Sequence, residues 1–124
     1  FADAVRAMLA AVEGRLDDAE TAAERVLGGR STYLDRIYAH LVRACVAFQR
    51  VDGVATDAAL DDARLIVEGT DDRTSRWLID LVAGICGRGD QAAAERYMAN
   101  AGLDATGLAT AWRLAARTEA VETS

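Results

Sequence analysis

The residues best suited to chemistry in this sequence are arginines and the single histidine, spaced so that they share one side of a helix. Arg36, His40 and Arg43 follow one another at intervals of four and three residues, and this spacing places side chains on one helical face. Arg76 and Arg113 extend the pattern on two later predicted helices. Guanidinium groups donate paired hydrogen bonds to carboxylates and stay charged at physiological pH. The pattern therefore indicates carboxylate recognition, and a solvated basic face paired with nearby acids is the alternative.

Catalytic chemistry has little support in the sequence. It contains one histidine, no Ser/His/Asp or Cys/His arrangement, no glycine-rich phosphate loop and no metal-ligand spacing. His40 and Cys45 lie about 140° apart around a helix, so their side chains do not converge. Adjacent acids such as Asp71 and Asp72 are explained by capping of a helix start. We therefore expect no enzyme activity, no cofactor and no metal site.

The two cysteines, Cys45 and Cys86, each fall in the apolar part of a predicted helix. Two such thiols supply neither a disulfide framework nor the clustered ligands of a zinc site. We expect both to be small buried hydrophobic residues rather than redox or nucleophilic groups.

Composition and charge narrow the class of protein. The 124 residues are 52% hydrophobic and 27% charged, which is typical of one globular domain, and the lack of proline favours helices throughout. A net charge of −6 disfavours direct binding to nucleic acid. No apolar run is long enough to cross a membrane and no signal peptide is evident, so we expect a cytoplasmic protein.

Two further features suggest a source and a context. Every basic residue other than histidine is arginine, and with the wealth of Ala, Gly, Asp and Val this suggests a GC-rich bacterial gene. The sequence begins at Phe1 and its first residues already have a helical pattern. We therefore expect residues 1–124 to be one domain from a larger protein.

Periodic apolar residues and turn signals divide the chain into seven predicted helices. Asp17 is the predicted N-cap of the second helix, and Thr32 or Ser31 begins the third. The segment from Val51 to Asp57 is predicted to be the longest connection. The helices are expected at about residues 2–13, 17–27, 32–51, 58–68, 73–86, 90–101 and 104–119.

Each predicted helix has one apolar face that should point into the core. The residues expected inside are Val5, Met8, Leu9 and Val12 in the first helix, Leu34, Ile37, Tyr38, Leu41, Cys45 and Phe48 in the third, Trp77, Leu78, Leu81, Val82 and Ile85 in the fifth, Ala93, Ala94, Tyr97 and Met98 in the sixth, and Leu108, Ala111, Trp112 and Ala115 in the seventh.

One stretch of the sequence recurs. Residues 22–25 read Ala-Ala-Glu-Arg, and residues 93–96, 71 positions on, read the same. Both follow a glycine-containing turn and a helix start, so they predict a recurring helix-turn-helix unit. A bundle without repeats, whose alanine-rich helices merely look alike, is the alternative.

The recurring unit resembles the tetratricopeptide (TPR) repeat, a pair of helices with a small residue at the turn and an alanine before an aromatic residue in the second helix. Trp77 stands at the early aromatic position, and Ala93 with Tyr97 reproduces the alanine-to-aromatic spacing. Gly14 and Ala19 match in the first unit. The resemblance implies an all-α, right-handed α-solenoid of antiparallel helix pairs. In style the chain is also similar to the helical sensor regions of large ATP-dependent bacterial transcription activators of the maltose-regulator type.

In TPR arrays the first helix of each pair lines a concave groove, and the resemblance therefore implies that the basic residues converge there. An acidic peptide or a carboxylate effector would be the ligand. The candidate ligand-binding residues are Arg36, His40, Arg43, Arg76 and Arg113.

Three classes of function remain open. The first is a protein-interaction or oligomerisation module of a larger cytoplasmic regulator, such as a transcription regulator, with a protein or peptide partner or a second copy as ligand. The second is an effector-sensing domain in which Tyr33, Tyr38, Trp77 and the arginines line a small-molecule pocket. The third is a non-catalytic fragment of an enzyme.

Overall fold

The computed structural model describes residues 2–118, which form seven α-helices and contain no strand. This confirms the all-α prediction and its number of helices for that part of the chain. None of these helices combines the length and the apolar character needed to cross a bilayer within the described residues. The helices are α1 (Ala2–Val12), α2 (Leu16–Gly28), α3 (Tyr33–Gln49), α4 (Gly53–Val67), α5 (Arg73–Ile85), α6 (Gln91–Asn100) and α7 (Ala105–Ala116).

The first six helices form three hairpins joined by turns with the same hydrogen bonding. Each turn holds one residue with positive φ, at Gly14 (77°), Val51 (57°) and Gly87 (77°). The next backbone N–H then bonds a carbonyl five residues back, a pattern that closes helix C-termini. These bonds run from Arg15 to Ala10, from Asp52 to Ala47 and from Arg88 to Ala83, at 2.7–2.9 Å.

Side-chain caps fix where most of the helices begin. In five of them the residue before the helix accepts a bond from the backbone N–H three positions on, which satisfies one of the free donors at the helix start. These N-caps are Thr32, Asp52, Asp72, Asp90 and Asp104, at 2.9–3.2 Å. The predicted cap at Asp17 is wrong, because α2 starts one residue earlier and Arg15 precedes it without a side-chain cap.

The predicted long connection from Val51 to Asp57 is also wrong. Asp52 caps α4, so the helix begins at Gly53 and the connection shrinks to a tight turn. The glycine at the first helical position concealed this start, since glycine is a poor helix former in the interior but tolerable at an end. The predicted end of the seventh helix at Glu119 lies outside the described residues.

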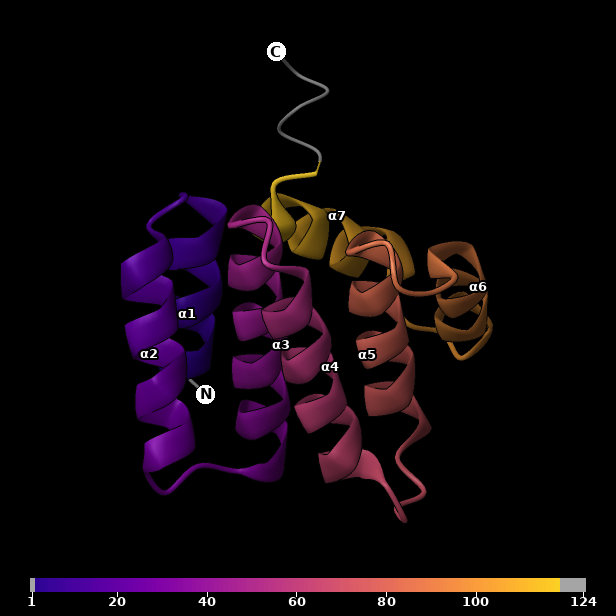
Figure 1. The fold of residues 1–124 in the computed structure, drawn as a ribbon. Coiled ribbons are helices and arrows are strands. Elements are labelled where there is room, and N and C mark those ends of the chain that lie inside the picture. The colour runs from indigo at the N-terminus through magenta and orange to yellow at the C-terminus, as the bar shows by residue number, and fades with distance from the viewer. Residues whose placement is uncertain (1, 119–124) are drawn as a thin grey trace.

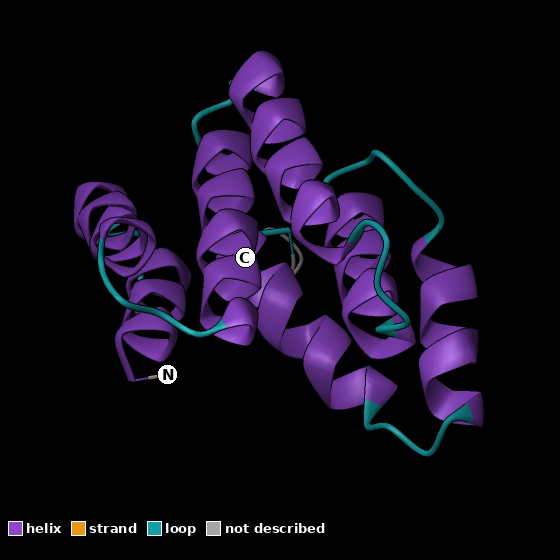
Figure 2. Cartoon of the chain, turned by 90° about the horizontal axis from the view of Figure 1, so that it is seen from below, coloured by secondary structure: helices purple, strands orange, loops and turns teal. Residues whose placement is uncertain are grey.

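The helix α7 lies across the others rather than continuing their order. In Figure 1 the hairpins stand side by side and α7 crosses behind the upper ends of α3 and α5; it packs against α1, α3, α5 and α6. Figure 2 gives the same crossing from below. Gln49 at the end of α3 joins the helices, donating to the carbonyls of Ala11 in α1 (3.0 Å) and Ala115 in α7 (2.5 Å). In a solenoid each repeat touches only its neighbours, so the contact of α7 with α1 departs from that expectation.

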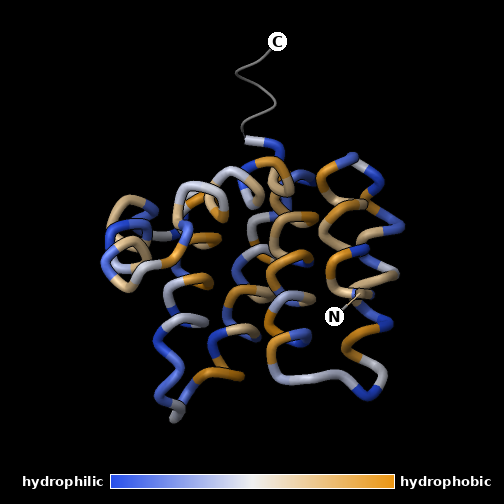
Figure 3. The backbone as a smooth tube through the Cα atoms, turned by 180° about the vertical axis from the view of Figure 1, so that it is seen from behind, coloured by the Kyte–Doolittle hydropathy of each residue, from blue (hydrophilic) through white to orange (hydrophobic). Residues whose placement is uncertain are grey.

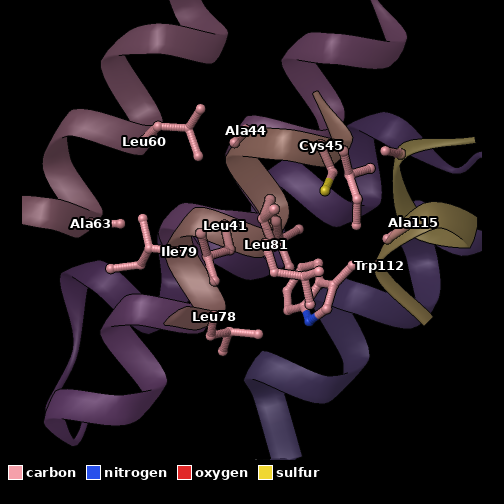
Figure 4. Packing of buried hydrophobic residues seen from close by; sticks show 14 of the residues in the cluster. Leu41, Ala44, Cys45, Leu60, Ala63, Leu78, Ile79, Leu81, Trp112 and Ala115 are labelled. Atoms are coloured by element: carbon pink, nitrogen blue, oxygen red, sulfur yellow. The ribbon is translucent and has the colours of Figure 1, made fainter. Parts of the chain in front are cut away.

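The core is built around Trp112, which α7 inserts between the hairpins. The Trp112 side chain is fully buried, as predicted, and lies beside Leu81 of α5 (Figure 4). Its ring meets the Tyr38 ring of α3 at a centroid distance of 5.6 Å. Leu41 and Ile79 extend the same cluster along α3 and α5. Large residues from three helices therefore meet at the point where α7 crosses.

Alanines make the contacts that bring neighbouring helices close. The buried residues of α1 are Ala4, Ala7, Ala10 and Ala11, whereas Leu9 is 52% exposed. The predicted inner face of this helix, built on its larger apolar residues, is therefore wrong. A face of alanines lets two helices approach closely, and the larger side chains on its flank are then left at the edge of the contact.

Two further predicted core residues lie outside. Tyr97 is 58% exposed and Leu34 is half exposed. In α6 the buried residues are Ala94 and Met98, one position later than the predicted alanine and aromatic pair. Figure 3 shows hydrophobic and hydrophilic residues alternating along the helices, a pattern that leaves the choice of buried face to the neighbouring helices.

The sequence repeat is displaced from the structural one by one helical turn. Ala19 and Ala94 are each the fourth residue of their helix and each is buried, and they lie 75 positions apart. The sequence match spans 71 positions, four fewer, which is close to one turn of helix. Matched residues therefore share a face but are not structural equivalents.

Candidate functional site

Two of the predicted ligand-binding arginines join helices together. Arg36 of α3 donates to the Leu27 carbonyl at the end of α2 at 3.1 Å. Arg76 of α5 donates to the Val67 carbonyl at the end of α4 at 3.0 Å, and also to Thr70. The last carbonyls of a helix lack internal partners and carry partial negative charge, which explains why a cation lies there. The same contact thus recurs 40 residues apart.

His40 and Arg43 do come together, on the side of α3 that faces α4. The Nη1 atom of Arg43 lies 3.0 Å from Nδ1 of His40 and 3.5 Å from a carboxylate oxygen of Asp62. Arginine only donates, so Nδ1 must accept and carries no proton. Burial lowers the pKa of His40 below its ordinary value, and the charge of Arg43 lowers it further. The pair is therefore a neutral histidine beside a salt bridge.

The predicted site residues do not form one cluster. Arg113 lies on α7, where it donates to the Thr110 hydroxyl at 3.5 Å. Arg36 and Arg76 lie at separate helix junctions, and His40 with Arg43 faces Asp62. Binding of an acidic ligand by these residues stays a prediction, and the structure gives each of them a contact within the chain.

The most prominent hollow of the described residues lies between α4 and α5. It encloses about 540 Å³, with Val67 and Ile79 as its buried floor. Leu65 forms one wall and is 65% exposed. Arg76 is the member of the predicted set that lines it. We call this hollow the α4–α5 groove; its residues are Asp61, Arg64, Leu65, Val67, Glu68, Gly69, Arg76, Ile79 and Asp80.

Helical spacing places these side chains on facing sides of the two helices. Asp61 and Leu65 are four residues apart on α4, and Arg76 and Asp80 are four apart on α5. Between the helices, Gly69 takes a positive φ of 77°, which ends α4 and lets the chain turn into α5. The turn therefore sets the width of the groove at its closed end.

The charged groups of the groove are unequally paired. Arg64 lies 3.5 Å from the carboxylate of Asp61, and Arg76 is turned into backbone carbonyls. Glu68 and Asp80 take part in no salt bridge within the described residues. Burial raises the pKa of Asp80, and the nearby charge of Arg64 offsets part of that rise. The groove thus presents unpaired carboxylates beside an apolar surface.

Sequence reasoning missed Leu65, although a signal was present. The predicted apolar face of the fourth helix used Leu60, Ala63, Ile66 and Val67, and Leu65 fell outside it. A large apolar residue on the polar side of an amphipathic helix indicates either a contact or an exposed patch. In this fold it is exposed.

The aromatic residues proposed for an effector pocket lie apart from one another. Tyr38 packs on Trp112 in the core, whereas Trp77 stacks on Tyr97 at a centroid distance of 6.2 Å and an interplanar angle of 9°. Cys45 and Cys86 are both free and buried, in agreement with the prediction. Their thiols are neighbours, and this contact with burial raises the pKa of Cys45. No group of three or more His, Cys, Asp or Glu within residues 2–118 is placed to hold a metal ion.

Comparison with known proteins gives no relative from which to transfer a function. No protein-family model matches the chain, and neither the curated proteins nor the solved structures include a match. The resemblance to TPR repeats and to maltose-regulator-type activators therefore stays a prediction from the sequence, and function must be argued from the geometry of this chain.

Proposed function

We propose that this domain is a protein-interaction module that binds a segment of a partner protein in the α4–α5 groove. The observation that carries the proposal is the exposure of Leu65 beside the buried floor of Val67 and Ile79. An apolar anchor position ringed by charged side chains is the usual anatomy of a protein-binding site. Covering Leu65 would contribute about 1–2 kcal/mol, and the charged rim would add selectivity.

A second candidate function is effector sensing at the same place. Its support is the volume of about 540 Å³, which falls within the roughly 300–1,000 Å³ of small-molecule pockets. The flanking charges would then orient a polar metabolite rather than a peptide. A metabolite screen read by thermal shift distinguishes the two, because a ligand confined to the folded state raises the melting temperature with its concentration.

The test of partner binding uses amide NMR spectra of the whole chain. A panel of helical peptides with leucine on one face, some with basic and some with acidic flanks, is titrated into the labelled protein. Binding in the groove shifts the resonances of Leu65, Gly69 and Asp80, which line it. The substitution Leu65→Ser should remove the binding.

A matched control comes from another exposed leucine. Leu9 of α1 is 52% exposed and lies outside the groove, so Leu9→Ser removes a similar area without touching the proposed site. It should bind the peptides as the unchanged protein does. If no peptide shifts the groove resonances, or if the two serine variants lose binding equally, the proposal is wrong. Sedimentation of the free chain with and without Leu65→Ser tests whether a second copy is the partner.

A further inference from the structure

We propose that the occupant of the α4–α5 groove is a basic amphipathic helix of a partner protein, an inference that rests on the groove being the binding site. Its apolar face would cover Leu65 and the floor at Ile79. Its lysine or arginine side chains would meet Glu68 and Asp80.

The walls of the groove favour a helical occupant. Both walls are α-helices, α4 and α5, whose backbone groups are bonded within their own helices. An extended segment needs a free strand edge to pair its own N–H and C=O groups, and these walls offer none. A helix satisfies its backbone internally and contributes only side chains. Recognition would therefore follow the helix-in-groove mode.

The charges of the groove favour a basic occupant. Its lining holds two arginines and three carboxylates, a formal charge of −1. Both arginines are already engaged, Arg64 with Asp61 and Arg76 with the carbonyl of Val67. Glu68 and Asp80 are left to face an incoming chain. The C-terminal end of α4 adds partial negative charge at the same place.

The position of Asp80 makes a cation more favourable still. Burial raises the pKa of this carboxyl, which means that its charged form lacks full solvation where it lies. An ammonium or guanidinium group from a partner would supply the missing stabilisation. A carboxylate in the same place would meet Glu68, Asp80 and the end of α4, all of the same sign.

Three synthetic helical peptides and the whole chain test the inference. The first carries leucines on one face with lysines beside them; the second has glutamate at each lysine position; the third has alanine at each leucine position. The leucine and lysine peptide should bind most tightly. Its affinity should fall as salt rises from about 0.1 M to about 1 M, because the Debye length shrinks from ~10 Å to ~3 Å.

Charge-removing variants locate the effect. The double variant Glu68→Gln, Asp80→Asn should weaken the leucine and lysine peptide about ten-fold or more, as expected when charge-assisted contacts are lost. Glu24→Gln is the matched control, because Glu24 is exposed on α2 and lies outside the groove. It should leave the affinity unchanged. Circular dichroism melts confirm that each variant is folded.

The outcomes separate this inference from the proposed function. If the glutamate peptide binds as tightly as the lysine peptide and shifts the same groove resonances, the basic helix is excluded while groove binding stands. The same holds if the double variant and the Glu24 control bind alike. If neither leucine peptide shifts those resonances, both proposals fall.

Discussion

At the scale of single residues, His40 shows how a predicted binding group can be absorbed by the fold. Its ring is only 9% exposed, and its Nδ1 accepts a hydrogen bond from Arg43. Burial first, and then the charges of Arg43 and Arg36, lower the pKa of His40, while Asp62 acts in the opposite direction. The folded protein therefore holds this histidine neutral more firmly than the unfolded chain does.

This lowered pKa predicts an acid-dependent loss of stability. In the unfolded chain the histidine has its ordinary pKa near ~6.5, so the unfolded state takes up the proton first as pH falls. The free energy of unfolding should decline as pH drops through about 6.5 and go on declining until the folded-state histidine is also protonated. Denaturant titrations at about pH 8 and about pH 5.5 measure the decline.

His40→Gln is the comparison for that prediction, since glutamine keeps an acceptor for Arg43 and does not titrate. The part of the decline that belongs to the histidine should be missing in this variant. An identical pH dependence in both proteins would mean that carboxyl groups, and not His40, cause the loss.

Val51 is a second residue whose local conformation stands out. It takes a positive φ of 57° at the turn where the other two hairpins have glycine, and its side chain is 91% exposed. A β-branched residue is disfavoured in this region because its Cβ approaches the neighbouring backbone. The exposed side chain gains little from burial in return.

Val51→Gly should therefore stabilise the protein by about 0.5–1 kcal/mol, the relief of strain exceeding the extra entropy of an unfolded glycine. The control is Val54→Gly, which removes an equally exposed side chain (83%) from within α4. There the glycine should destabilise, by up to about 1 kcal/mol. Chemical denaturation measures both, and a loss of stability in Val51→Gly would show that the turn is unstrained.

At the scale of elements, the α5–α6 hairpin depends on a close approach of backbones. Gly84 lies inside α5, and a Cβ added there would come within 2.5 Å of the Gln91 nitrogen and 2.7 Å of its Cα. These are backbone atoms at the start of α6, so they cannot rotate aside as a side chain can. The glycine sets how near the two helices pack.

Gly84→Ala should therefore destabilise the protein by about 1–3 kcal/mol, although alanine is the better helix former. Gly28→Ala is the contrast, because a Cβ at the end of α2 would meet nothing within 4 Å. That substitution should be neutral or slightly stabilising. Urea titration of the two variants side by side would contradict the close-approach argument if Gly84→Ala gained stability.

The elements themselves could be predicted well where local chemistry decides them. Thr32 and Asp72 were predicted as helix starts, and both caps are present. Gly102, with a φ of 82°, ends α6 as predicted. Local signals failed at Gly53, where a poor helix former follows a good cap. They failed also in choosing the buried face of α1, since that choice depends on which neighbour packs there.

The candidate site could be predicted only in part, for a related reason. Arg76 was predicted and does line the groove, but the groove itself results from the spacing of α4 and α5. Neither helix reveals that spacing in its own sequence. Arg36 and Arg43 have the residue type and spacing of a binding face, yet the fold uses them for contacts with Leu27 and Asp62. Whether an arginine binds a carbonyl or a ligand is a property of the assembled chain.

At the scale of the whole molecule, α7 holds the hairpins together through one buried ring. Trp112 is fully buried against Tyr38 and the surrounding cluster, whereas Trp77 is only partly buried against Tyr97. The two tryptophans therefore differ in what their removal exposes. One leaves a cavity where three helices meet, and the other mainly uncovers a surface.

Trp112→Ala should accordingly cost about 3–5 kcal/mol, the range for loss of a buried aromatic side chain, and Trp77→Ala clearly less. Guanidinium titration monitored by circular dichroism gives both values on the same scale. Equal losses in the two variants would mean that the crossing of α7 contributes no more than the α5–α6 surface does.

The contact between α7 and α1 also has a consequence for how the protein is made. A chain emerging from the ribosome releases α1 first, and the 92 residues between Val12 and Ala105 must follow before α7 can begin to appear. At rates of 5–20 residues per second this takes roughly 5–20 s. Throughout that interval the nascent hairpins have no α7 to cover their ends, and Gln49 has no Ala115 carbonyl to bind. The newly made chain therefore passes through a stage in which a chaperone would find apolar helix ends that the finished protein hides.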